Sequence, residues 1–153
     1  MDISVLMKIL IASILATAVM TAFSYIVSES FKKLFKEPVL LSYAIGRFHL
    51  NTSQNTERVL AWLLHFFIGF MFVVSYHFIW KWDLRSFSFP ISLILGALSG
   101  IIGIISWHFI FKFTNHQPRI VFKEYYLQLF IAHVFFGATA YYSYLLLGEH
   151  FLG

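Results

Sequence analysis

The sequence predicts an all-α protein, a four-span transmembrane helix bundle that forms a single membrane domain over residues 1–153. Hydrophobic residues make up 59% of the chain and charged residues only 12%, and the mean hydropathy is +0.77, which is far from the balance of a soluble domain. Four apolar runs, at residues 5–27, 59–80, 90–113 and 125–147, reach the roughly 20 residues that cross a hydrocarbon core. The remaining segments are too short for a soluble domain.

The first apolar run has some features of a signal peptide, because Lys8 precedes a stretch that contains Ala16-Thr17-Ala18. It continues to spanning length without a basic leader, so we expect a membrane span. The chain contains no cysteine, which excludes disulfides, thiolate metal sites and cysteine nucleophiles.

The basic residues predict the orientation, because cytoplasmic loops collect Lys and Arg. We expect both termini outside an inner (cytoplasmic) membrane and the loops 28–58 and 113–125 in the cytoplasm. The partners expected are the lipid bilayer, with anionic lipid at the basic loops, and a second copy or a larger membrane complex, but no nucleic acid. The two loops and the residue just before the second contain Lys32, Lys33, Lys36, Arg47, Arg58, Lys112, Arg119 and Lys123.

The first of these loops is long enough for a short helix of its own. Phe31, Leu34 and Phe35 share one face, opposite three lysines, which predicts an amphipathic helix in the headgroup plane. Pro38 should interrupt this helix, and residues 39–45 should form a second apolar piece.

Small residues predict where the spans pack closely, since lipid gives no hydrophobic drive between helices. The third span places Gly96, Gly100 and Gly103 on one face. The first span carries a stripe of small residues: Ala12, Ser13, Ala16, Thr17, Thr21 and Ser24. Aromatic residues near the span ends predict interfacial belts: Tyr76, Trp80, Trp82, Trp107, Tyr125, Tyr126 and Tyr142.

The second and fourth spans share the pattern His-x-x-x-Gly-x-x-x-x-x-Ser-Tyr, which suggests two parallel helix-pair repeats. Histidine is costly in hydrocarbon, so each imidazole marks a candidate functional site. His, Gly and Tyr fall on nearly the same helical face in both copies. The copies read His65, Gly69, Ser75, Tyr76 and His133, Gly137, Ser143, Tyr144.

The rise of a helix places His65, His108 and His133 in the cytoplasmic half of the membrane. In a structural interpretation, each imidazole bonds to a neighbouring helix. In a b-type haem interpretation, His65 and His133 ligate the iron, and Gly69 and Gly137 make room for the macrocycle. Arg47, Arg58 and Arg119 are then the partners for the propionates.

Two further interpretations use other polar residues. In a proton or ion relay, the histidines act with Glu57 and Glu124. In a zinc site, His65, His108 and His133 supply three nitrogens, but we expect no buried aspartate or glutamate to act as a base. We therefore predict a non-enzymatic packing or subunit component whose binding or structural centre is the intramembrane histidine face.

A set of short motifs carries a resemblance to a known family. They are Gly46-Arg47-Phe48-His49, Glu57-Arg58 followed by Trp62, His65 and Gly69, and finally His133 and Gly137. Together they resemble a family of small four-helix bacterial membrane proteins of unknown function. The resemblance covers most of the chain after the first span and implies a four-span inner-membrane protein without an assigned activity.

Overall fold

The computed structural model describes residues 3–47, 53–82, 87–114 and 120–151, which form five helices. Four of these helices are long and apolar enough to cross a membrane. The predicted all-α, four-span architecture is therefore confirmed, and the chain is a multi-pass membrane protein. The helices are α1 (Ile3–Phe31), α2 (Glu37–Arg47), α3 (Gln54–Trp82), α4 (Phe89–Phe113) and α5 (Phe122–Phe151).

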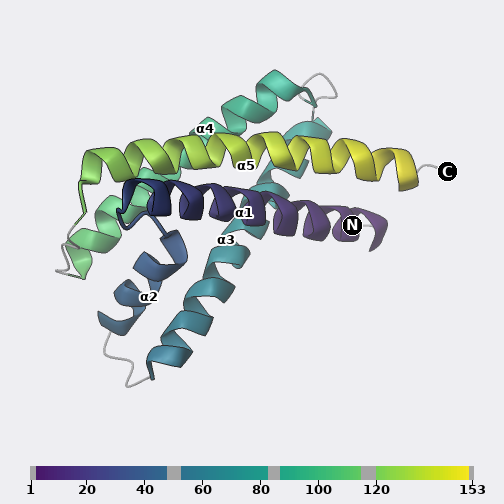
Figure 1. The fold of residues 1–153 in the computed structure, drawn as a ribbon. Helices are drawn as coiled ribbons and strands as arrows, with labels where there is room; N and C mark the ends of the chain where they lie inside the picture. Colours follow the sequence, from purple (N-terminus) through teal and green to yellow (C-terminus); the bar gives the residue numbers. More distant parts are fainter. Residues whose placement is uncertain (1–2, 48–52, 83–86, 115–119, 152–153) are drawn as a thin grey trace.

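Helix α5 is central to the packing, because it lies against both α1 and α4. Helices α1 and α5 run antiparallel side by side, and α3 and α4 cross this pair steeply (Figure 1). Helix α3 packs against α1 and α2 but barely touches α4. The start of α1 and the end of α5 lie at the same end of the bundle (Figure 1).

The position predicted for the short helix was wrong. Helix α1 ends at Phe31, and Lys32 follows with a φ of 51°, the left-handed conformation that often closes a helix. Pro38 does not interrupt a helix but lies in the first turn of α2, where its missing N–H leaves no bond unmade. The amphipathic stretch before it thus becomes a non-helical connector, and Phe35 within it is buried.

Close crossings at small residues confirm the predicted packing faces. A Cβ atom placed on Gly96 would lie 2.5 Å from the carbonyl oxygen of His133, and one on Gly137 would lie 2.3 Å from that of Ser92. A Cβ atom on Gly69 would lie 2.0 Å from Thr17 Oγ1. In each of the two repeats, therefore, the glycine sits against the span that precedes it.

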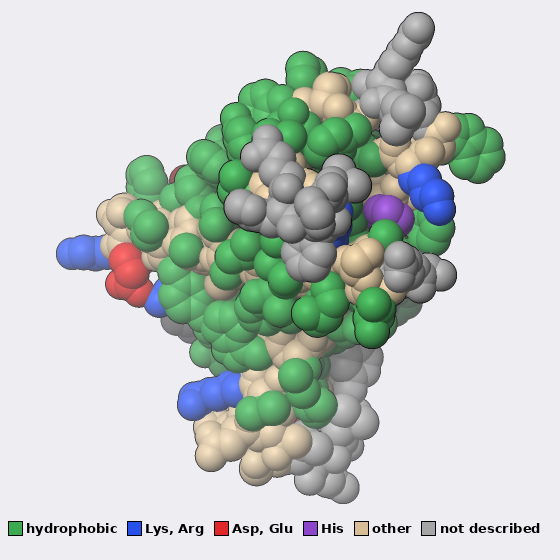
Figure 2. All heavy atoms as spheres, turned by 90° about the vertical axis from the view of Figure 1, so that its right-hand side faces the viewer, with side chains coloured by type: hydrophobic (Ala, Val, Ile, Leu, Met, Phe, Trp, Pro, Cys, Tyr) green, Lys and Arg blue, Asp and Glu red, His purple; other side chains and the backbone are tan. Residues whose placement is uncertain are grey.

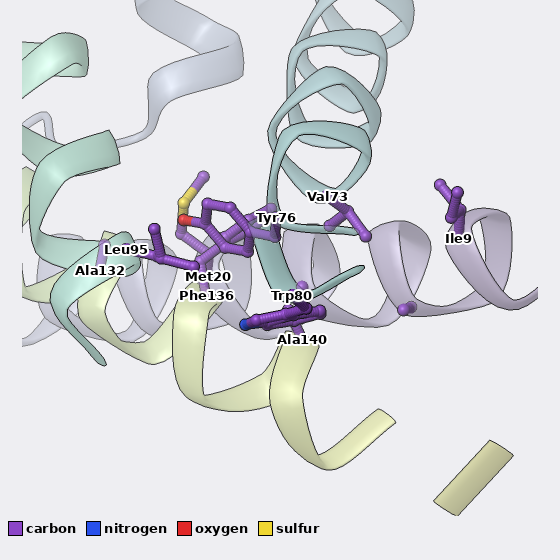
Figure 3. Close-up of a cluster of buried hydrophobic side chains, with 11 residues drawn as sticks. Ile9, Met20, Val73, Tyr76, Trp80, Leu95, Ala132, Phe136 and Ala140 are labelled. Carbon is purple, nitrogen blue, oxygen red and sulfur yellow. The ribbon is translucent and has the colours of Figure 1, made fainter. Parts of the chain in front are cut away.

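The buried apolar side chains form two clusters. One joins α1, α3, α4 and α5 around Met20, Tyr76 and Phe136 (Figure 3). The other cluster joins the connector before α2 with α2, α3, α4 and α5, and its largest members include Leu40, Trp107 and Tyr125. Most of the surface seen from the end where α5 terminates is hydrophobic, with few charged side chains (Figure 2).

Several aromatic residues that we assigned to interfacial belts lie in these clusters. Tyr76, Trp80, Trp107 and Tyr125 are all buried, whereas Trp82 is 93% exposed. The interfacial belts stay a prediction, and at these four positions the side chains pack between helices.

Candidate functional site

A partly enclosed cavity of about 110 Å³ lies inside the bundle and is lined by residues of all five helices. Its walls are mostly apolar, from side chains such as Met20, Phe72 and Ile102. The polar side chains that line it are those of Glu37, His65, Ser106 and His133. Two of the predicted histidines and one unpredicted carboxyl group therefore face a common space.

His65 is buried on α3 and connects that helix to α1. Its Nε2 atom lies 2.9 Å from Thr21 Oγ1, and this hydroxyl lies 2.7 Å from the carbonyl oxygen of Thr17. The hydroxyl has only one proton, which it donates to that carbonyl, so Nε2–H of His65 is the donor to Oγ1. The edge of the imidazole also contacts Trp62 and Phe66.

His133 is buried on α5 and has a free ring nitrogen. Its Nδ1 atom lies 2.8 Å from the carbonyl oxygen of Leu129, one turn earlier. A carbonyl only accepts, so Nδ1 carries the proton, and Nε2 of the neutral ring keeps a lone pair. Nε2 lies near Gly103 of α4 and has no hydrogen-bond partner among the residues that the structure describes. His133 is thus a proton acceptor on the cavity wall.

Glu37, the first residue of α2, is the site residue that the sequence analysis missed. It is 2% exposed, which corrects our expectation that no buried carboxylate exists. Its Oε1 atom accepts a hydrogen bond of 2.7 Å from Ser24 Oγ on α1, and Gln128 Nε2 on α5 lies 3.4 Å away. Burial raises the pKa of the Glu37 carboxyl to about 7, although the bonds from Ser24 and Gln128 oppose this.

The surroundings of Glu37 are rich in oxygen atoms and poor in donors. Gln128 Nε2 donates to Ser24 Oγ at 2.6 Å, so the three side chains form one hydrogen-bonded group. Glu37 Oε2, Gln128 Oε1 and the hydroxyl of Tyr125 are buried, and none has a hydrogen-bond partner among the described residues. A buried carboxylate is costly when it is charged and has no cation beside it, so a proton on Glu37 lowers the energy of this group.

The other predicted residues lie elsewhere. His108 is exposed on α4 and lines a separate groove with Lys112 and Tyr126. Glu57 is half-buried and covers Gly46, while Arg47 is exposed at the end of α2. Glu124 is exposed and forms an ion pair with Lys33. Arg119 and His49 lie outside the described residues.

The three histidines that we considered as zinc ligands do not lie together. The structure separates His108 from the cavity that His65 and His133 line. Within the described ranges, no three His, Asp or Glu residues are grouped so that they could hold a metal ion. The three-histidine zinc set is therefore not assembled.

The cavity residues do not fit a bis-histidine haem. His133 has the geometry of a ligand, because a carbonyl fixes Nδ1–H and leaves Nε2 open. His65 cannot offer the same atom, because its Nε2 carries the proton that it donates to Thr21. The volume of about 110 Å³ is also well below the roughly 300–1,000 Å³ of cofactor sites. Gly69 and Gly137 bring helices into contact and leave no slot for a macrocycle.

The sequence did contain a weak signal for Glu37. The residue precedes Pro38 and lies between two apolar pieces, Leu34-Phe35 and Val39-Leu40-Leu41. A carboxylate in such a setting is a candidate for burial, and a proline next to it is typical of a helix start. Its partners are 13 and 91 residues away.

Comparisons of the chain with protein-family models, curated proteins and solved structures give no match.

Proposed function

We propose that this chain is a small, non-enzymatic membrane protein that binds and relays protons at a polar centre inside its bundle. The centre consists of Glu37, His65 and His133, and His133 is the acceptor. The observation that carries the proposal is that titratable side chains from α2, α3 and α5 line one cavity with otherwise mostly apolar walls. Ionisable groups enclosed by membrane-spanning helices are rare and are characteristic of ion and proton pathways.

The geometry supports the individual roles. Glu37 has an oxygen without a donor and a pKa of about 7, so its carboxyl group exchanges a proton near neutral pH. His133 Nε2 offers a lone pair near Gly103. A cavity of about 110 Å³ has room for several water molecules, which can bridge the groups.

Proton flux into liposomes tests the proposal. The full chain is reconstituted with a trapped pH-sensitive dye, and a potassium gradient with valinomycin drives protons inward. We expect flux above that of empty liposomes, and we expect Glu37→Gln to abolish it because the amide cannot take up the proton. Glu57→Gln makes the same change at a half-buried carboxylate outside the cavity and should leave the flux unchanged.

Two results would overturn the relay. One is wild-type flux equal to that of empty liposomes. The other is equal flux in the wild type and Glu37→Gln, with both proteins eluting as the same folded species.

The second candidate is a packing or subunit component in which the polar centre only joins helices. The Thr21–His65 bond favours it, because this bond connects α1 to α3, and Ser24 and Gln128 connect α1 to α5. This candidate gains support if no flux is found while His65→Ala changes the self-association of the purified protein.

We also propose the finer placement of the chain. The basic residues of loops 28–58 and 113–125 favour a cytoplasmic position for these loops and an outside position for both termini. The resemblance to small four-helix bacterial proteins supports an inner membrane. Anionic lipid at the basic loops and a second copy or a larger complex are the partners that fit this placement.

A further inference from the structure

A second hollow lies on the outside of the bundle, between α1 and α5. It has a volume of about 460 Å³, within the roughly 300–1,000 Å³ of ligand sites. Phe23 and Val27 of α1 and Leu127 and Ile131 of α5 form its apolar walls, together with Phe35 of the connector. This groove is separate from the cavity that His65 and His133 line.

The groove has one charged end and one apolar end. Lys33 and Glu124 line the charged end and form an ion pair there. Toward the other end, the ring of Phe23 contacts that of Phe135 in a tilted arrangement, with ring centroids 4.9 Å apart. The distance along α5 from Glu124 to Ile131 is about 10 Å at 1.5 Å per residue. In the orientation proposed above, the groove runs from the level of the headgroups into the hydrocarbon.

The charge near the groove mouth is positive. Lys36 is paired with Glu29, and Lys33 with Glu124. Lys32 and Lys123 adjoin Lys33 and Glu124 in the sequence, are exposed and form no ion pair with any described residue, so the segments next to the groove carry two lysines in excess of the paired glutamates. Each basic residue near a membrane surface attracts anionic lipid by about 1 kcal/mol. The mouth thus complements a phosphate group, and the walls complement an acyl chain.

We infer that this groove binds an anionic glycerophospholipid, with one acyl chain between α1 and α5 and its phosphate at Lys33. Glu124 competes with the phosphate for Lys33 and sets the strength of binding. Gln128 forms part of the groove wall and is bonded to Ser24 and Glu37 on its other side, so the lipid lies one hydrogen-bonded layer away from the polar centre.

Native mass spectrometry of the full chain tests this inference. The protein is purified in mild detergent with equal amounts of phosphatidylglycerol and phosphatidylcholine of the same chain length. We expect one retained phosphatidylglycerol in preference to phosphatidylcholine. Lys33→Gln should reduce this preference by about five-fold, equivalent to about 1 kcal/mol. Glu124→Gln should increase it, and Lys81→Gln at the far end of α3 should leave it unchanged.

The acyl part of the site is tested by filling the groove. Val27→Trp adds bulk inside it, whereas Ile26→Trp places the same side chain on the adjacent exposed face, where Ile26 is 66% exposed. We expect only Val27→Trp to lose the bound lipid. The Lys33 and Lys81 variants keep the test valid if Val27→Trp does not fold, because these lysines lie outside the core.

Several results would overturn the inference. Equal retention of phosphatidylglycerol and phosphatidylcholine by the wild type would show that the charged end does not prefer an anionic headgroup. Unchanged retention in a folded Val27→Trp would place the lipid elsewhere. A lipid-free dimer that Val27→Trp dissociates would show that a second copy of the chain occupies the groove.

Discussion

At the scale of single residues, the carboxyl group of Glu37 is costly to bury. It is 2% exposed and is held by one serine and one glutamine, with no basic side chain hydrogen-bonded to it among the described residues. A buried carboxylate without a cation is unfavourable when charged. The neutral form therefore dominates until the pH exceeds the raised pKa.

This predicts how stability depends on pH. The pKa of Glu37 is about 7 in the folded chain, against an ordinary value of 4.5. The folded state holds the proton more tightly, so its contribution to stability is full below about pH 4.5, falls as the pH rises to 7, and stays low above that. In the wild type, the free energy of unfolding should fall by up to about 3 kcal/mol over this pH range. Glu37→Gln should remove this decrease. Thermal unfolding in detergent between pH 4.5 and 8 measures it.

The control for this prediction is Glu57→Gln, which should keep the pH dependence of the wild type. If Glu37→Gln and the wild type lose stability in parallel from pH 5 to pH 8, the burial of Glu37 does not control its proton.

The hydrogen bond between Thr21 and His65 predicts a second residue-level effect. Thr21→Val keeps the shape of the side chain but removes the hydroxyl that joins α1 to α3. Bonds of this kind between membrane helices contribute about 0.6–2 kcal/mol, so the unfolding midpoint in detergent should fall. Thr139→Val is the matched control, because the Thr139 hydroxyl bonds to Phe135 of its own helix. Equal midpoints for the two variants would contradict this role.

At the scale of helices, the crossing of α4 and α5 leaves no space for added atoms. The two backbones meet at Gly96 and Gly137, where an added Cβ atom would contact backbone and not flexible side chains. Overpacking at such a contact costs about 1–3 kcal/mol or more. The close approach of α4 and α5 therefore requires glycine at both positions.

Replacing Gly137 by alanine should thus destabilise the chain, since the new Cβ would lie 2.3 Å from the carbonyl oxygen of Ser92. Gly148→Ala is the matched control on the same helix, because nothing lies within 4 Å of a Cβ atom there. Alanine also favours helix by about 1 kcal/mol over glycine. Unfolding midpoints should fall for the first variant and hold or rise for the second, and a reversed order would disprove the tight crossing.

The sequence predicts the helices well and the polar centre only in part. Hydropathy over about 20 residues is a local property, so four spans follow directly, as do the glycine faces. The burial of Glu37 depends on Ser24 and Gln128, which chain folding brings together from distant positions. Likewise, the helical rise places His65 and His108 at similar predicted depth, but only the packing of the helices decides that one faces inward and the other outward.

At the scale of the whole molecule, the proposed orientation predicts which loops are accessible from each side. The chain contains no cysteine, so Lys123→Cys and Lys81→Cys each introduce a unique thiol near opposite ends of the bundle. In intact cells, a membrane-impermeant maleimide should label Lys81→Cys, whereas Lys123→Cys should react only after the membrane is opened. Labelling of Lys123→Cys in intact cells would reverse the orientation.

The bond between Gln128 and Ser24 joins residues 104 positions apart, and this separation has a consequence for biogenesis. Helix α1 is synthesised before α5, so Ser24 and Glu37 cannot form their hydrogen bonds to Gln128 until α5 is present. Until then, α2 has no complete docking site and its acidic first residue lacks a neighbour from α5. A chain truncated before α5 should therefore be cleaved at α2 more readily than the full chain, which limited proteolysis in membranes measures.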